Sequence, residues 1–144
     1  MRVGYAVARP EMTALLNRVR PVFNVNVLAQ AAAVAALDDL AFLEETFHVN
    51  REGMAQLTQA LDRLQLPSIP SAGNFLAVDF SGQALTAAQV FQGLLNAGFV
   101  VRPLSPYGLP DFLRITIGTA AQNAGLMVAL EGLLAAEAGR ACQS

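Results

Sequence analysis

The chain of 144 residues contains no lysine, no tryptophan, one cysteine and one histidine. Its basic residues are therefore all arginines, and its formal net charge is only -2. That balance excludes a broad basic surface for nucleic acid or for an anionic membrane. The single cysteine, Cys142, leaves no internal disulfide, which is typical of a reducing compartment, and we expect a cytoplasmic protein. One cysteine and one histidine are too few ligands for a zinc cluster, so no metal site is expected.

Long apolar runs are also missing. Even the alanine-rich segment 25–37 is interrupted by Asn26 and Gln30. We therefore expect neither a transmembrane helix nor a signal peptide. Hydrophobic residues nevertheless make up 54% of the chain and charged residues only 14%, whereas soluble domains are about a quarter charged. This surplus excludes disorder and indicates surface that another domain or chain covers.

The first half of the sequence predicts a strand followed by long helices. The strand, over 3–8, begins almost at the first residue, which indicates a chain cut from a longer one. Helices are expected over 10–20, over 24–37, where the alanine-rich segment should be buried on most sides, and over 39–64, where one apolar stripe recurs. The proline-rich stretch 67–73 is turn punctuation and the best candidate boundary.

The second half predicts a small α+β layer. The expected elements are, in order, a strand over 75–80, a helix over 86–96, strands over 99–102 and 113–117, and a helix over 119–138. Both helices open on a capping box, in which a threonine hydroxyl and a glutamine three residues later exchange hydrogen bonds with the first turn (Thr86 with Gln89, and Thr119 with Gln122). Alternation in the last strand places Leu113 and Ile115 on one face and Arg114 on the other.

Common catalytic groups are scarce. His48 lies within an expected helix, where a satisfied or partly exposed histidine is the simpler interpretation. No Gly-x-Ser-x-Gly, dinucleotide-binding or Walker motif is present. The acidic pairs 38–39 and 44–45 are adjacent in sequence, so their side chains diverge on a helix and do not form an acid/base pair.

Three arginines stand out by position. Arg2 opens the first expected strand, Arg102 ends a short strand, and Arg114 lies within a strand on the face opposite its apolar residues. A guanidinium in such a place requires a carboxylate or a bound anion, because it pairs with two oxygens at once. From spacing alone, an internal ion pair of Arg114 with Asp79 or Asp111 and a bound anion both remain open.

Taken together, several motifs resemble histidinol-phosphate aminotransferases. The motifs cover nearly the whole chain and follow one another in the family's order. They are specific together, whereas any one of them alone would be a weak signal. The segments that carry it are 2–6, 18–26, Gln30, 35–39, 73–75, 101–103, 107–110 and 113–119.

This resemblance implies the fold-type I architecture of pyridoxal-phosphate enzymes, in which a large domain holds the cofactor and a small domain closes on the substrate. We expect 1–38 to derive from the large domain, 39–66 to form a long connecting helix, and 67–144 to form the small C-terminal α+β domain. The family's Schiff-base lysine precedes the segment that matches 2–6. It is absent here, and no other lysine replaces it.

Carried over residue by residue, the resemblance makes Arg2 a contact of the cofactor phosphate. It makes Arg114 the residue that grips the anionic end of the substrate, with Arg102 its neighbour there. Asn26 and Asn74 match positions near the site. That anionic end is a phosphate in a histidinol-phosphate enzyme and can be a carboxylate in aromatic amino acid relatives.

Two functional readings follow. In the first, the chain is the C-terminal part of an aminotransferase of histidine biosynthesis, which acts on a small anionic amino substrate, uses 2-oxoglutarate as acceptor and forms a homodimer. This part alone should be inactive and bind no cofactor, because transamination needs the lysine amine. In the second, it is a non-enzymatic module that binds small anions or self-associates through exposed apolar surface.

Overall fold

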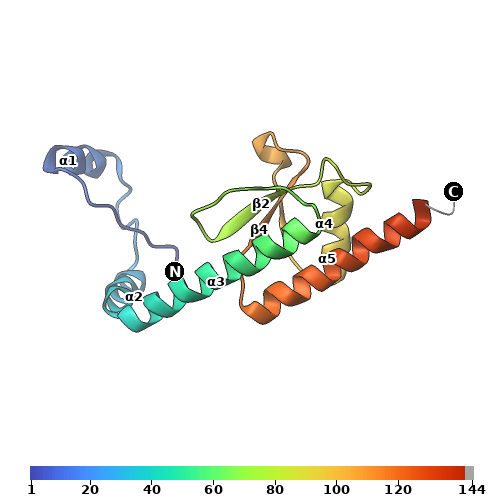
Figure 1. The fold of residues 1–144 in the computed structure, drawn as a ribbon. Helices are drawn as coiled ribbons and strands as arrows, with labels where there is room; N and C mark the ends of the chain where they lie inside the picture. The colour runs from blue at the N-terminus through green and yellow to red at the C-terminus, as the bar shows by residue number, and fades with distance from the viewer. Residues whose placement is uncertain (142–144) are drawn as a thin grey trace. The chain divides into compact units, whose positions relative to one another are not determined.

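The computed structural model describes residues 1–141 and divides into two compact units, Met1–Glu45 and the part from Thr46 onward. Cys142 lies outside the described residues. The elements follow in this order (Figure 1): α1 (Pro10–Val19), α2 (Val27–Asp38), α3 (Leu40–Arg63), β1 (Ser68–Ile69), β2 (Phe75–Asp79), α4 (Ala87–Asn96), β3 (Arg102–Pro103), the short 3-10 helix η1 (Ser105–Tyr107), β4 (Phe112–Thr116) and α5 (Ala120–Ala141).

The second unit is an α+β layer, as the sequence predicts. Its four strands form one antiparallel sheet in the order β1-β2-β4-β3. The sequence analysis missed β1, a two-residue edge strand between Pro67 and Pro70 in the stretch interpreted as turns. It also placed β3 too early, over 99–102, because the apolar residues before Arg102 resemble a strand but do not pair.

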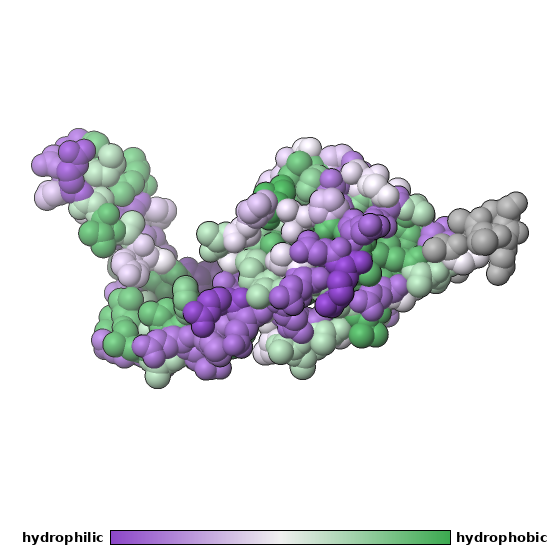
Figure 2. Space-filling model, in the orientation of Figure 1, coloured by the Kyte–Doolittle hydropathy of each residue, from purple (hydrophilic) through white to green (hydrophobic). Residues whose placement is uncertain are grey.

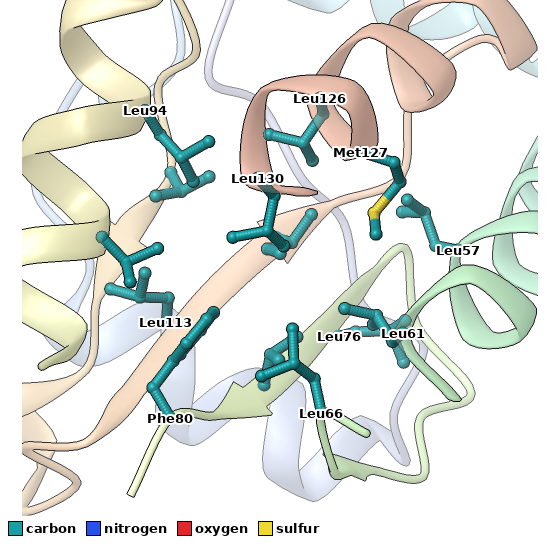
Figure 3. Packing of buried hydrophobic residues seen from close by; sticks show 14 of the residues in the cluster. Leu57, Leu61, Leu66, Leu76, Phe80, Leu94, Leu113, Leu126, Met127 and Leu130 are labelled. Atoms are coloured by element: carbon teal, nitrogen blue, oxygen red, sulfur yellow. The ribbon is translucent and has the colours of Figure 1, made fainter. Parts of the chain in front are cut away.

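The core of this unit lies between one face of the sheet and the helices. Strands β2 and β4 contribute alternate residues to that face. In Figure 3, Met127 of α5 points toward Leu57 of α3, while Leu126 and Leu130 of α5 extend toward Leu94 of α4. Leu113 and Ile115 of β4 are 0% and 1% exposed, which confirms the predicted alternation. Helices α3, α4 and α5 all contribute residues to this core, so they cover the same face of the sheet. Arg114 alternates with the core residues of β4 and therefore lies on the opposite face.

Both predicted capping boxes are present. Thr86 and Gln89 exchange the two hydrogen bonds at the start of α4. At the start of α5 the Thr119 backbone N–H donates to Gln122 Oε1 over 2.9 Å, and the Gln122 N–H donates to Thr119 Oγ1 over 3.4 Å. These bonds satisfy amides that the first helical turn leaves without partners, so each helix begins where its threonine stands.

The first unit departs from two expectations. Residues 1–9 form no strand, so the predicted strand over 3–8 is wrong; a strand needs a neighbour to pair with, and this unit contains none among its described residues. Helix α2 is formed, but only Ala29 on it is buried, so its expected burial on most sides is also wrong. Figure 2 shows the exposed apolar residues of this segment. Its sequence is that of a covered helix, and within its own unit nothing covers it.

A buried joint holds the start of α5 against α3. Asn123 is 2% exposed, and its amide donates to Gln56 Oε1 over 3.2 Å and to the Gly118 carbonyl over 3.1 Å. Its Oδ1 accepts from the Gly118 N–H over 2.9 Å. Gly53 faces this joint from α3, where a Cβ would lie 2.5 Å from Ile117 Cγ2 and 3.0 Å from the Gly118 carbonyl oxygen. The joint therefore requires a residue without a side chain at 53.

We expect Gly53→Ala to destabilise the second unit by about 1–3 kcal/mol, because the added methyl overpacks the joint. Chemical denaturation followed by circular dichroism measures the change. Gly132→Ala in α5 is the matched control, since a Cβ there meets nothing within 4 Å; it should be neutral or stabilising by up to about 1 kcal/mol. Equal stability of the two variants would contradict the tight packing at Gly53.

Among residues 1–141, none of the helices has the length and apolar character needed to cross a lipid bilayer.

Candidate functional site

The candidate site lies on the face of the sheet that the helices leave uncovered. Arg114 stands in the middle of β4 and pairs in register with Ala77 of β2 on one side and with Arg102 of β3 on the other. Side chains of directly opposed residues in an antiparallel sheet share a face, with Cβ atoms about 5 Å apart. The two arginines are therefore neighbours on adjacent strands.

Arg114 has no anionic partner within the described residues. Its Nε is buried without a hydrogen-bond acceptor, and its guanidinium carbon lies 5.3 Å from the ring centre of Phe75. The ion pair with Asp79 or Asp111 that the sequence left open is absent from the described part of the chain. Asp79 Oδ1 instead accepts from the Ser81 N–H over 2.8 Å in the turn after β2. Among the described residues, the Arg114 guanidinium is thus in contact with an aromatic ring and with no carboxylate.

Arg102 is held by an aromatic residue from the loop that follows its strand. Its Nη2 donates to the Tyr107 hydroxyl over 3.0 Å, and its guanidinium carbon lies 5.7 Å from the centre of the Tyr107 ring. Gly108 ends the 3-10 helix with a φ of 78°, a conformation that glycine adopts without strain. This turn brings Tyr107 back toward β3.

Sequence analysis missed Tyr107 and Phe75 as members of the site. Each lies within a segment that resembled the family. Phe75 begins β2, which carries no arginine, whereas Tyr107 is an aromatic residue close in sequence to β3, the strand that carries Arg102. That combination is a usable signal, because arginine stacks readily on aromatic rings. Which aromatic meets which arginine nevertheless depends on the strand register.

The electrostatics of this face favour an anion. Two cations directly opposite each other across a strand pair destabilise a sheet. Neither forms an ion pair with a carboxylate of the described residues. An anion bound between them would relieve the repulsion and would accept hydrogen bonds from both guanidinium groups. The arrangement can therefore bind a phosphate or a carboxylate group.

The other predicted site residues lie elsewhere. Asn74 is exposed just before β2, and its backbone carbonyl accepts from the Ile117 N–H over 2.8 Å. Arg2 and Asn26 belong to the first unit, where both are exposed. Asn26 caps α2, because its Oδ1 accepts from the Ala29 N–H over 2.8 Å. Arg2 has a φ of 54°. The structure therefore brings together Arg102 and Arg114 but does not relate them to Arg2 or Asn26.

His48 is a helix residue, as expected. Its side chain is 51% exposed, and its Nε2 lies 3.3 Å from a carboxylate oxygen of Glu52 one turn further along α3. Within the described residues, no group of three histidine, cysteine or acidic side chains is placed to hold a metal ion.

A separate hollow of about 480 Å³ opens between α3 and the strands β1 and β2. Its charged lining residue is Asp62, whose carboxylate disfavours an anion there, and it includes neither Arg102 nor Arg114. The hollow and the arginine pair are therefore different features of the unit.

Comparison with known proteins gives relatives over most of the chain. The family model described as aminotransferase class I and II matches residues 1–130. Histidinol-phosphate aminotransferase 2 of Ralstonia nicotianae is 54% identical over 135 residues, which cover 94% of this chain and 36% of the relative. Histidinol-phosphate aminotransferase 1 of Cupriavidus pinatubonensis is 51% identical over 134 residues, covering 93% and 36%. The chain thus spans about a third of the length of these curated relatives.

Solved structures show the same likeness. The histidinol-phosphate aminotransferase of Sinorhizobium meliloti, crystallised with pyridoxal-5'-phosphate, superposes with a TM-score of 0.76 at 26% identity, covering 88% of this chain and 35% of that one. The L-threonine-O-3-phosphate decarboxylase of Porphyromonas gingivalis has the same TM-score and identity and covers 89% and 40%. Both neighbours are named for phosphorylated compounds.

Proposed function

Because the chain belongs to the class I and II aminotransferase family, we propose that it supplies the substrate-gripping C-terminal part of an aminotransferase that acts on histidinol phosphate or a related amino donor. The acceptor is a 2-oxo acid such as 2-oxoglutarate, and the pathway is histidine biosynthesis. The observation that carries this proposal is the pair of arginines on the uncovered sheet face, neighbours by register and without a carboxylate partner in the described residues. The expected fold-type I architecture is confirmed by the structural neighbours.

The proposal assigns the chain's segments to the parts of such an enzyme. Residues 1–38 contribute to the large domain, 39–66 form the connecting helix, and 67–144 form the small domain. The many exposed apolar side chains before residue 46 support this assignment, because a larger domain would cover them. The assembled enzyme is a cytoplasmic homodimer in this proposal, in keeping with its single cysteine.

Enzymes of this family depend on pyridoxal phosphate, which supplies the electron sink for chemistry at the amino-bearing carbon. The residues of this chain do not fit that cofactor by themselves, because the group must be held by a lysine amine and the sequence contains no lysine. We therefore propose that the chain alone binds no pyridoxal phosphate and is inactive. Within an assembled enzyme, Arg2 is the proposed contact of the cofactor phosphate.

The substrate roles fall to the second unit. Arg114 binds the anionic end of the substrate and Arg102 binds a further oxygen of the same group. Asn74, from the segment just before β2, is a further proposed contact. Asn26 of the first unit is a further proposed contact in the assembled enzyme, as the resemblance implies. A doubly charged phosphate uses both guanidinium groups, whereas a carboxylate needs only one. The pair therefore favours histidinol phosphate over the aromatic amino acid alternative.

A chimeric enzyme tests this proposal directly. The 135 residues of this chain that align with the Ralstonia relative would replace the matching third of that relative, which contributes the remaining two thirds. We expect the chimera to transaminate histidinol phosphate at a rate within about tenfold of the parent. A folded chimera that binds pyridoxal phosphate but prefers phenylalanine would support the aromatic alternative, and one that transaminates neither substrate would contradict the function.

The exposed apolar surface of the first unit supports a second candidate, a self-associating module without enzymatic activity. Val27, Leu28 and Val34 of α2 are 79%, 75% and 62% exposed, and water disfavours so much apolar area on one segment. In this candidate the partner is a second copy of the chain.

We expect the 144-residue chain to sediment as a concentration-dependent oligomer, and the double variant Leu28→Glu/Val34→Glu to shift it toward monomer. Analytical ultracentrifugation measures the change. The matched control is Val100→Glu/Val128→Glu, which alters two equally exposed valines of the second unit (83% and 70% exposed) and should leave the oligomer unchanged. A monomeric unaltered chain at high concentration would contradict self-association.

A further inference from the structure

Tyr107 has a position that the arginine pair alone does not explain. It ends the 3-10 helix η1 directly after β3, and its side chain is 63% exposed on the side of Arg102. Its hydroxyl accepts a hydrogen bond from Arg102 Nη2 over 3.0 Å, and its ring lies against the same guanidinium. Two separate contacts thus tie this one tyrosine to one of the two cations.

The hydrogen-bonding capacity of the tyrosine hydroxyl is only partly used. A phenolic hydroxyl both accepts and donates. Its acceptor side is occupied by Arg102, while its own proton has no acceptor among the described residues. Arg102 makes the hydroxyl a better donor, because a hydrogen bond accepted from a cation polarises the O–H bond. The site therefore presents a neutral donor directly beside Arg102, which is the strand neighbour of Arg114.

We propose that Tyr107 is a specificity-determining residue of the anion site: it donates its hydroxyl proton to a third oxygen of the bound group and so favours a phosphate monoester over a carboxylate. This inference rests on the proposed function and deepens it. A carboxylate has two oxygens, which one guanidinium satisfies in a bidentate pair. A phosphate monoester presents three terminal oxygens and a second charge, so it uses Arg114, Arg102 and the Tyr107 hydroxyl together.

The test uses the whole 144-residue chain with methyl phosphate and acetate as probes at about pH 7, where the monoester is mainly doubly charged. Binding is followed by NMR through the backbone and side-chain N–H signals of Arg102 and Arg114. Tyr107→Phe keeps the ring and removes only the hydroxyl. Tyr5→Phe is the matched control, because Tyr5 and Tyr107 are the two tyrosines of the chain and Tyr5 belongs to the first unit.

The control variant also provides a direct probe. With no tryptophan in the chain, Tyr107 is the one tyrosine emitter left in Tyr5→Phe. Methyl phosphate should change its fluorescence, since the hydroxyl gains an anionic acceptor, and acetate should change it less. A fluorescence that methyl phosphate leaves unaltered overturns the proposed contact.

For Tyr107→Phe we expect about a tenfold loss of methyl phosphate affinity, the usual size for a lost hydrogen bond to a charged group, and unchanged acetate affinity. A parallel loss for both probes would make Tyr107 a merely structural support of Arg102 and overturn the inference. An unchanged ratio of methyl phosphate affinity to acetate affinity would overturn it as well. In either case, methyl phosphate binding that is lost on replacement of Arg114 would still support the proposed function. If the unaltered chain shows no phosphate shifts at Arg102 and Arg114, both proposals fail.

Discussion

Histidinol phosphate and 2-oxoglutarate should remain unchanged when they are incubated with the 144-residue chain and pyridoxal phosphate. Transamination needs an amine that bonds to the cofactor and then moves a proton at the reacting carbon. Lysine performs both tasks, and none of the 144 residues is a lysine. Arginine cannot substitute, because its guanidinium stays protonated at any pH the protein withstands.

Proton NMR of the reaction mixture, taken over hours at high protein concentration, measures this outcome. The chimera with the Ralstonia relative is the positive control, because in the proposed function the other two thirds of the enzyme supply the lysine that this chain lacks. Glutamate formation by the chain alone would contradict the proposed inactivity, provided that ultrafiltration of the protein removes the activity and that free cofactor does not account for it.

The second large effect is expected at Arg114. Replacement by leucine should weaken methyl phosphate binding about 100-fold, because it removes a charge and a bidentate pair of charge-assisted hydrogen bonds. The same replacement should leave the unfolding free energy unchanged or raise it by about 1 kcal/mol. The native Nε is buried without an acceptor and its neighbour across the strand is another cation, and removal of both unfavourable features offsets the loss of the contact with the Phe75 ring.

Arg63→Leu is the matched control for this prediction. It alters the net charge equally, but Arg63 is an exposed residue at the end of α3 and is not a strand neighbour of Arg102. NMR titration measures the affinity, and chemical denaturation measures the stability. An equal loss of phosphate affinity in the two variants would mean that the overall charge of the chain, and not the position of Arg114, determines binding. A marked destabilisation by Arg114→Leu alone would mean that Arg114 holds the sheet together and is not reserved for a ligand.

Much of the second unit was accessible from sequence because its signals are local. A capping box acts within one turn of helix, so Thr86 and Thr119 predicted where α4 and α5 begin. Alternation in β4 depends only on the period of a strand, so it placed Arg114 opposite the core residue Leu113. The lack of lysine is likewise a property of composition, and the proposed inactivity of the chain alone rests on it.

The tertiary structure alone decided which residues meet. The register of β3 against β4 sets Arg102 beside Arg114, and the turn at Gly108 brings Tyr107 back to Arg102. No local pattern encodes a strand register, and none indicated that Asp79 would serve its own turn and leave Arg114 without a carboxylate.

The first unit shows the converse limit. The residues over 3–8 have the composition of a strand and α2 has the composition of a buried helix, yet the structure neither pairs the former nor covers the latter. Sequence by itself determined the apolar character of these segments and the helical state of α2. Pairing and burial were decided by tertiary structure, because both are interactions between two surfaces and a single segment carries only one of them.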